Sequence, residues 1–197
     1  HWESLGNKWK LVTDTHYKPY PCCRWAHPSI DAASELMLHH NISHQGIASV
    51  KIRTFHNATR LAGHKPVSAD EFAYSIAFPV ACMIVRGQVG VSELEVSTLK
   101  DPNILRISAA TTLIEDAHLT QISEGKRWAQ VAILMRNGTR YEAAPGTPRG
   151  DTDLPLSDDE ISEKFHHFSD HILGSTIARK IEELTTSFDE LDATGVQ

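Results

Sequence analysis

The stretch WAQVAILMRNGTRYEAA, residues 128–144, decides how we interpret the fold. Its apolar residues predict a strand over residues 128–136. Asn137-Gly138 follows, and this pair is typical of a two-residue turn between antiparallel strands, because both positions of that turn need a positive φ. We therefore predict that residues 139–144 pair back on the preceding strand as a β-hairpin.

Further strands and helices are predicted on both sides of this hairpin. Alternation around Val50 and Ile52 indicates a half-buried strand over residues 47–55. Pro79 lies inside an apolar helical stretch, so that helix either kinks there or a second helix begins at Pro79. The remaining predicted segments are short strands at 10–13 and 110–118 and helices at 28–40, 69–86, 92–108, 158–172 and 175–188. Because strands and helices are segregated, we predict an α+β fold with a mostly antiparallel sheet packed with helices.

Composition excludes several classes of protein. The chain has 197 residues, with 19 Lys and Arg against 25 Asp and Glu, so a broad nucleic-acid surface is not expected. No run of about 18 apolar residues predicts a membrane span. Three cysteines do not indicate a disulfide framework, which favours a reducing compartment. We expect a cytoplasmic protein, or one of the mitochondrial matrix in a eukaryote. Because the chain begins with His1 rather than Met, we expect it to be part of a longer protein.

A dense cluster of reactive and aromatic side chains lies between Tyr17 and His27, just before the predicted helix at 28–40. A helix N-terminus offers free backbone N–H groups and the positive end of the helix dipole. Together with Lys18, Arg24 and His27 it would suit a carboxylate or phosphate. The alternative is a solvated loop whose aromatic side chains fill the core, and the sequence leaves both interpretations open.

Motifs for other chemistries are not found. The adjacent Cys22 and Cys23 do not match the spacing of zinc ligands, so we expect no metal there. His167 and His171 share one helix face, and we interpret them as surface or partner-facing residues. No dinucleotide-binding, P-loop or serine-hydrolase motif occurs.

Five groups of residues, in order along the chain, resemble the MmgE/PrpD family, which includes 2-methylcitrate dehydratase, cis-aconitate decarboxylase and iminodisuccinate epimerase. They are Lys18 to Cys23 with His27 and Ile30-Asp31-Ala32; Ser75 to Ala81 through Gly87; Asp101-Pro102; Arg136 to Thr139; and Gly150 with Pro155-Leu156-Ser157, Glu160 and Lys164-Phe165.

The resemblance implies a two-domain protein of which this chain is the smaller part. In the family an all-helical N-terminal domain pairs with an α+β lid domain, the active site lies between them, and the usual assembly is a homodimer. We therefore expect residues 1–27 to be an N-terminal segment with a basic active-site loop, and residues 28–197 to be the lid domain. The N-terminal helical domain would be missing, so the isolated chain should be inactive.

The resemblance also implies a cofactor-free and metal-independent lyase, a dehydratase of small di- or tricarboxylates such as 2-methylcitrate. Lys18 and His27 would be catalytic. The expected substrate-binding residues are Arg24, Cys23, Tyr20 and Phe78. Cys23 stands where the decarboxylases of the family use a histidine, and Phe78 stands where they use a tyrosine. Both differences weaken the assignment of this chain as a decarboxylase. The alternatives are an isomerase or epimerase, a cis-aconitate decarboxylase, or a non-catalytic anion-binding or dimerisation module.

Overall fold

A computed structural model describes residues 14–187 together with residues 3, 6, 7 and 10. The chain divides into two units, His1–Leu154 and Pro155–Gln197, which we describe separately. The sequence led us to expect a boundary after residue 27, and it did not predict this division after Leu154. Apart from Lys10, the strand expected at residues 10–13 lies outside the described residues.

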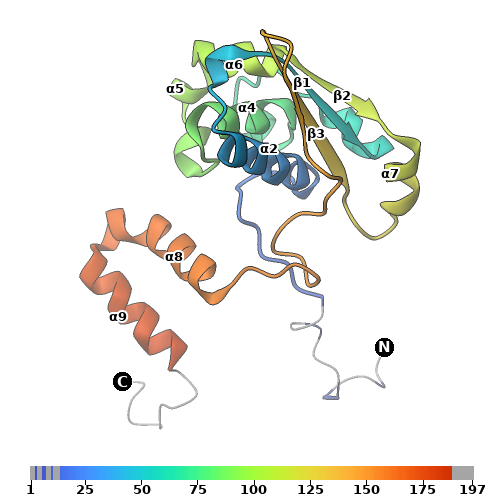
Figure 1. The fold of residues 1–197 in the computed structure, drawn as a ribbon. Helices are drawn as coiled ribbons and strands as arrows, with labels where there is room; N and C mark the ends of the chain where they lie inside the picture. Colours follow the sequence, from blue (N-terminus) through green and yellow to red (C-terminus); the bar gives the residue numbers. More distant parts are fainter. Residues whose placement is uncertain (1–2, 4–5, 8–9, 11–13, 188–197) are drawn as a thin grey trace. The chain divides into compact units, whose positions relative to one another are not determined.

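The first unit contains a four-stranded sheet in the order β2-β1-β3-β4 (Figure 1). Its strands are β1 (Ile47–Thr54), β2 (Thr111–Glu115), β3 (Ala129–Met135) and β4 (Arg140–Glu142). β3 and β4 are antiparallel, with Leu134 opposite Arg140, and Gly138 in their turn has a φ of 88°. The antiparallel hairpin is therefore confirmed, whereas the expected turn type is wrong, because Asn137 does not have a positive φ.

The sheet is mixed, because one of its pairings is parallel. β3 runs antiparallel to both β1 and β4, but β1 and β2 are parallel, with Val50 opposite Thr111. The chain between β1 and β2 passes through several helices before it re-enters the sheet, which is how parallel neighbours are joined. The α+β class is confirmed, whereas the prediction of a mostly antiparallel sheet is only approximate.

The helices follow the predictions closely, with two differences. The first unit contains α2 (His27–His40), α3 (Ala69–Ala73), α4 (Ala77–Arg86), α5 (Val96–Leu99), α6 (Pro102–Ala109) and α7 (Ala117–Ile122), with short 3₁₀ turns at Arg24–Ala26, His44–Gly46, His56–Leu61 and Val91–Leu94. α7 was not predicted. Its cap is Asp116, whose carboxylate accepts from the backbone N–H groups of His118 and Leu119.

The helical stretch over residues 69–86, in which Pro79 indicated either a kink or the start of a second helix, forms two helices. Backbone N–H groups of Ile76 and Ala77 donate to the carbonyls of Leu61 and Ala62, at 2.8 and 3.1 Å, instead of to a preceding helical turn. The break therefore lies a few residues before Pro79. Pro79 falls in the first turn of α4, where its lack of an N–H group leaves no helical hydrogen bond unmade.

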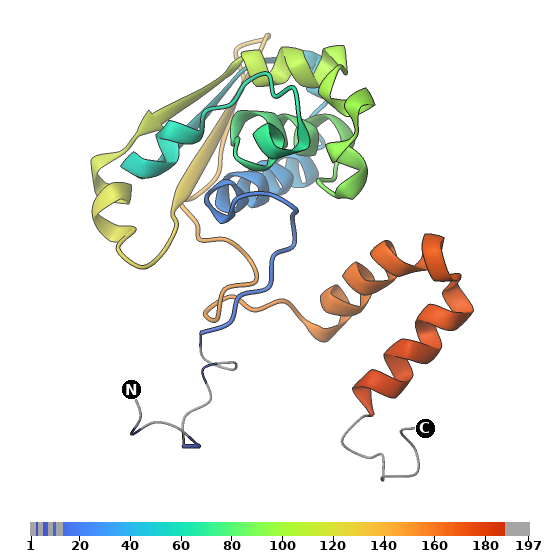
Figure 2. The same cartoon turned by 180° about the vertical axis from the view of Figure 1, so that it is seen from behind.

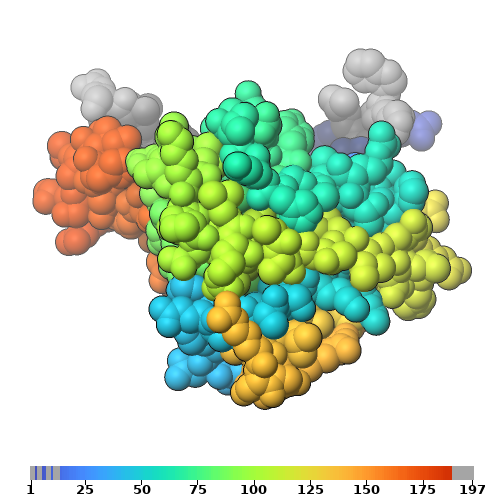
Figure 3. Space-filling model, turned by 90° about the horizontal axis from the view of Figure 1, so that it is seen from above, coloured from blue at the N-terminus to red at the C-terminus, as the bar shows by residue number. Residues whose placement is uncertain are grey.

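The core of the first unit lies between the sheet and its helices. Figures 1 and 2 show α2 and α4 side by side on one face of the sheet. Ile30 of α2, Ile52 of β1 and Ile133 of β3 are fully buried in this layer. The opposite face carries polar side chains such as Lys51, which is exposed. Figure 3, viewed from above, shows the segment from α5 to β2 as a continuous surface next to the β3–β4 turn.

One edge of the first unit brings several segment ends together, and we call it the site end. β1 and β2 both end there and β3 begins there, since Thr54 lies opposite Glu115 and opposite Ala129. Trp25, just before α2, packs edge-on against Phe55, with ring centroids 5.6 Å apart. Residues from the start of α2 therefore meet the loops that follow β1 and precede β3.

The second unit contains two helices, α8 (Asp158–Leu173) and α9 (Ser175–Thr186). A capping box begins α8, since Ser157 and Glu160 bond reciprocally. His166 joins the two helices: its Nδ1 lies 2.8 Å from Asp170 and its Nε2 lies 2.8 Å from Glu182 on α9. Several large apolar side chains remain exposed, among them Ile172 and Ile177.

We predict that His166 makes the helix pair sensitive to pH. Its hydrogen bonds to Asp170 and Glu182 raise the pKa of the imidazole above its usual value. Protonated His166 therefore stabilises the pair fully below the unfolded pKa of about 6.5, and this contribution is lost as pH rises through the raised folded-state pKa. The protection factors of the α9 amides, which compare the exchange rates with those of an unfolded chain at the same pH, should fall over that pH range. His166→Gln should remove the pH dependence, while His171→Gln, at an exposed position of α8, should preserve it.

Candidate functional site

The segment that carries the predicted site residues is held along its length by the loop at residues 145–154 and by α3. The N–H group of Tyr17 donates to the carbonyl of Gly150 at 2.9 Å, and the N–H group of Cys23 donates to Ala73 at 2.7 Å. Pro19 and Pro21 lie between these two anchors and restrict the backbone further. Lys18 is exposed, and its Nζ donates to the carbonyl of Cys22 at 3.3 Å. The segment therefore presents Lys18 to solvent from a backbone fixed on both sides.

Asp151 lies at the centre of the contacts that fix this segment. One of its oxygens accepts from Nε of Arg24 at 3.1 Å and from Nη2 of Arg24 at 2.6 Å, and Nδ1 of His16 lies 3.0 Å from the same oxygen. Nη2 of Arg24 also donates to the carbonyl of Arg149 at 2.6 Å. Asp151 is 4% exposed and Arg24 8%, so this ion pair is buried. A buried charge of this kind is tolerated because both partners are paired and hydrogen-bonded.

His27 is fully buried beneath the segment, and its two ring nitrogens have different roles. Nδ1 lies 2.9 Å from Nη1 of Arg24, and Nε2 lies 3.3 Å from the carbonyl of Cys22. A guanidinium can only donate, so Nδ1 must accept, and the ring proton must reside on Nε2 and point to Cys22. His27 is therefore neutral in this arrangement and links Arg24 to the backbone beside Lys18.

Tyr20 connects the segment to α2 and to the same loop. Its hydroxyl donates to Asp31 at 2.6 Å, and Nε of Arg149 donates to that oxygen of Asp31 at 3.1 Å. Burial, followed by the charge of Asp31, raises the pKa of Tyr20, so its phenol stays protonated. Asp31 and Arg149 line an open groove of about 680 Å³. Because Asp31 pairs with Arg149, this groove offers little free positive charge.

The two adjacent cysteines differ in their surroundings. Cys22 is buried, and burial raises the pKa of its thiol to about 12, so it carries no thiolate near neutral pH. Cys23 is half-buried. Cys82 lies inside α4, where burial again raises the thiol pKa. Cys22 and Cys82 are therefore packing residues.

Within residues 14–187, no three His, Cys, Asp or Glu side chains are grouped as metal ligands would be. No helix of that part combines the length and the apolar character that crossing a bilayer requires.

Comparison with known proteins gives two matches. The MmgE/PrpD C-terminal domain matches residues 20–190. The chain belongs to the MmgE/PrpD family. A cis-aconitate decarboxylase-like protein of Aspergillus oryzae is 24% identical over 201 residues, which cover 94% of this chain and 40% of the relative. This MmgE/PrpD domain thus spans less than half the length of the relative it matches.

The structure brings together five of the six predicted site residues of this MmgE/PrpD domain. Lys18, Tyr20, Cys23, Arg24 and His27 all lie in the segment or directly beneath it. Phe78 comes from a different element, α4, where it is fully buried and its ring packs on Phe72 with centroids 5.7 Å apart. Only Lys18 is exposed, whereas Arg24 and His27 have buried partners. Catalysis by His27 and substrate binding by Arg24, Cys23, Tyr20 and Phe78 stay predictions.

The sequence analysis missed the residues that hold the site in place. Asp151, Arg149 and Asp31 pair with Arg24 and Tyr20 from positions up to 129 residues away. Asp31 and Gly150 were noted only as parts of the family pattern. A weak signal existed, because a buried arginine needs an acidic partner, but the sequence contains 25 acidic residues and does not show which one is close.

Gly150 offers a test of the contact between the loop and the segment. Its φ is +85°, and a Cβ there would lie 2.0 Å from the carbonyl oxygen of Tyr17. We predict that Gly150→Ala lowers the free energy of unfolding by about 3 kcal/mol or more, since left-handed strain and a backbone clash add together.

Gly138 is a matched control, because its φ is +88° but a Cβ there would meet nothing within 4 Å. Gly138→Ala should cost only about 1 kcal/mol of left-handed strain. Urea unfolding of both variants measures the difference. Equal losses in the two variants would contradict the close approach at Tyr17.

Proposed function

We propose that this MmgE/PrpD domain supplies one half of the active site of a lyase that dehydrates small di- or tricarboxylates such as 2-methylcitrate. The observation that supports this is the exposed Lys18 on a backbone fixed by Gly150 and Ala73. A cation held in one place stabilises charge that develops in a transition state better than a mobile one, because no reorganisation is needed during the reaction.

The proposed reaction is an elimination that needs no cofactor. A base removes the proton on the carbon next to a carboxylate, and the electron pair left behind delocalises into that carboxylate. It then forms a carbon–carbon double bond as hydroxide leaves the neighbouring carbon, giving an unsaturated acid and, with the abstracted proton, water. Negative charge on the carboxylate increases in the transition state, and the ammonium group of Lys18 would stabilise it.

The proton-abstracting base is not among the residues to which we assign a role here. His27 is buried, with Nδ1 accepting from Arg24, and would have to exchange that bond to reach a substrate. We propose that the base lies on a further helical domain of a longer protein, which closes on this one and excludes water. Exposed Ile172, Ile177 and Leu184 on the helices of the second unit are expected of a surface that another domain covers. A homodimer of that longer protein is part of the proposal.

Two other activities would use the same charge stabilisation. The Aspergillus relative is named as decarboxylase-like, which favours loss of carbon dioxide from cis-aconitate as the second candidate. Reprotonation on the opposite face, as in an isomerase or epimerase, is the third. A non-catalytic anion-binding or dimerisation module would use Lys18 for binding alone.

The test of the proposal is Lys18→Ala in the longer protein. Loss of one preorganised electrostatic group should lower kcat by roughly 10²-fold or more. Lys18→Arg should restore part of the loss, because it restores the charge with a different geometry. Turnover of 2-methylcitrate and cis-aconitate, followed by NMR of the products, measures the effect and separates dehydration from decarboxylation.

Lys65→Ala is the matched control, since Lys65 is exposed and makes no hydrogen bond with another residue of the described part of the chain. Its turnover should equal that of the unmodified protein. Unchanged turnover in Lys18→Ala would contradict the enzyme proposal and favour the binding module. Turnover by the 197-residue chain alone would contradict the proposal that another domain supplies the base.

A further inference from the structure

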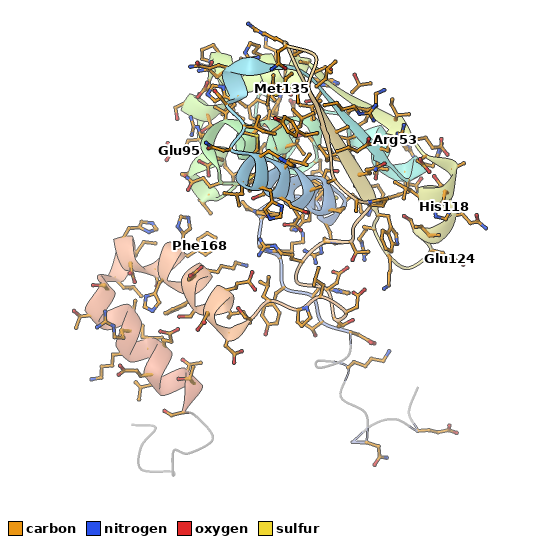
Figure 4. All side chains as sticks on the ribbon, in the orientation of Figure 1. Arg53, Glu95, His118, Glu124, Met135 and Phe168 are labelled. Carbon is orange, nitrogen blue, oxygen red and sulfur yellow. The ribbon has the colours of Figure 1, made fainter. Side chains whose placement is uncertain are left out.

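A hollow of about 420 Å³ lies at the site end of the first unit, and Trp25 and Phe55 are among the residues that line it. Its walls come from the residues that follow β1, from α7 and from the loop before β3. Glu124, which belongs to that loop and lines the hollow, is labelled in Figure 4 at one edge of the first unit. Met135, at the end of β3, is labelled at the opposite edge. Lys18, on which the proposed function rests, does not line this hollow, so the two sites are separate.

Two cations of the loop line the hollow, and one of them has no partner. Arg127 is half-buried and forms neither a hydrogen bond nor an ion pair with any residue in the described part of the chain. Lys126 contacts Asp153 at 2.5 Å, but both side chains are more than 40% exposed, so water weakens that pair. Among the described residues, Glu124 is the only acidic one that lines the hollow. The charges of these three lining residues give one net positive charge, while Asp153 and Glu115, which contact the lining residues Lys126 and His56, do not themselves line the hollow.

The same hollow has an aromatic wall. Trp25 and Phe55 line it, and their rings meet edge to face, with an interplanar angle of 81°. Trp25 is only half-buried, so part of its indole ring faces the hollow or solvent. A flat ligand can pack on such a surface, and a guanidinium beside it can bond a carboxylate with two parallel N–H groups.

Neutral donors complete the rim. The side-chain amides of Asn57 and Gln121 line the hollow, and neither is hydrogen-bonded to another residue of the described part. His56, by contrast, directs Nδ1 to Glu115 at 2.9 Å, so that nitrogen is already used. Apart from Glu124, these lining groups can all donate hydrogen bonds, and donation is what a bound carboxylate needs.

We propose that this hollow binds a small carboxylate with a flat, unsaturated or aromatic body. The carboxylate lies on Arg127, with Lys126 adding charge, and the flat body lies against Trp25. A guanidinium fits a planar carboxylate through its fork of donors, and the aromatic wall selects against compact anions that have no apolar part.

The experiment titrates the ¹⁵N-labelled 197-residue chain with benzoate, and separately with acetate and inorganic phosphate. Benzoate should shift the amide signals of residues 55–57 and 120–127 with saturation. Acetate and phosphate, which lack a flat body, should bind at least about tenfold more weakly, because they forgo the contact with the indole ring.

Two variants locate the site, and both positions are accessible enough for the fold to persist. Arg127→Gln removes the charge, and Gln121→Glu adds a repelling carboxylate at the exposed rim. Each should weaken benzoate binding by about tenfold or more, since a charge-assisted hydrogen bond is lost or opposed. Arg53→Gln, a half-buried arginine on the open face of the sheet, should leave it unchanged. Unshifted signals elsewhere verify that each variant is folded.

Three results would overturn the proposal. The first is linear, non-saturating shifts with benzoate. The second is equal affinity for benzoate in Arg127→Gln and in the unmodified chain. The third is saturation by phosphate at the same concentration as benzoate, which would indicate a general anion site. None of these results bears on Lys18, so failure here is distinguishable from failure of the proposed function.

Discussion

The buried ion pair between Arg24 and Asp151 is the interaction on which the arrangement of the site depends. It joins the residues just before α2 to a loop more than a hundred positions further along the chain. Through its remaining N–H groups, Arg24 also orients His27 and bonds the carbonyl of Arg149. One guanidinium thus fixes the base of the segment that carries Lys18. If Asp151 were removed, Arg24 would keep its charge in a buried place without compensation, which is why such pairs are strongly destabilising to break.

The buried and the exposed residues of the segment therefore have different roles. Residues that look reactive in the sequence, such as His27 and Cys22, are used to build the loop, whereas the exposed Lys18 is the group that can meet a ligand. The neutral state of His27 is itself a consequence of the neighbouring guanidinium, which forces Nδ1 to accept. The segment therefore has less net positive charge than its Lys and Arg residues indicate, because Asp151 neutralises Arg24.

Local sequence signals predicted most of the secondary structure. The hairpin at Asn137-Gly138 and the helix boundary near Pro79 each depend on neighbouring residues, and each was placed to within a few residues. The parallel pairing of β1 with β2 was not predictable in the same way, because it depends on the path of the intervening helices. Pro79 indicated a break in the helical stretch, but the exact position of the break depends on hydrogen bonds to the turn ending at Leu61, which no local pattern encodes.

The site was predicted in part, for the same reason. A cluster of Lys, Arg, His and aromatic residues marked the correct segment, but it could not show which of them point outward. Exposure is decided by partners such as Asp151 and Asp31, which lie in other elements. Asp151 stands in a loop of Pro, Gly and Arg, where an exposed aspartate would be the ordinary expectation.

A double-mutant cycle on Arg24 and Asp151 tests the central claim most directly. Unfolding free energies are measured for Arg24→Gln, Asp151→Asn and the double variant, together with amide exchange at Tyr17. The account predicts a coupling energy of about 2 kcal/mol or more between the two positions, with accelerated exchange at Tyr17 in every variant. Effects that add within about 0.5 kcal/mol, with protection at Tyr17 unchanged, would contradict it.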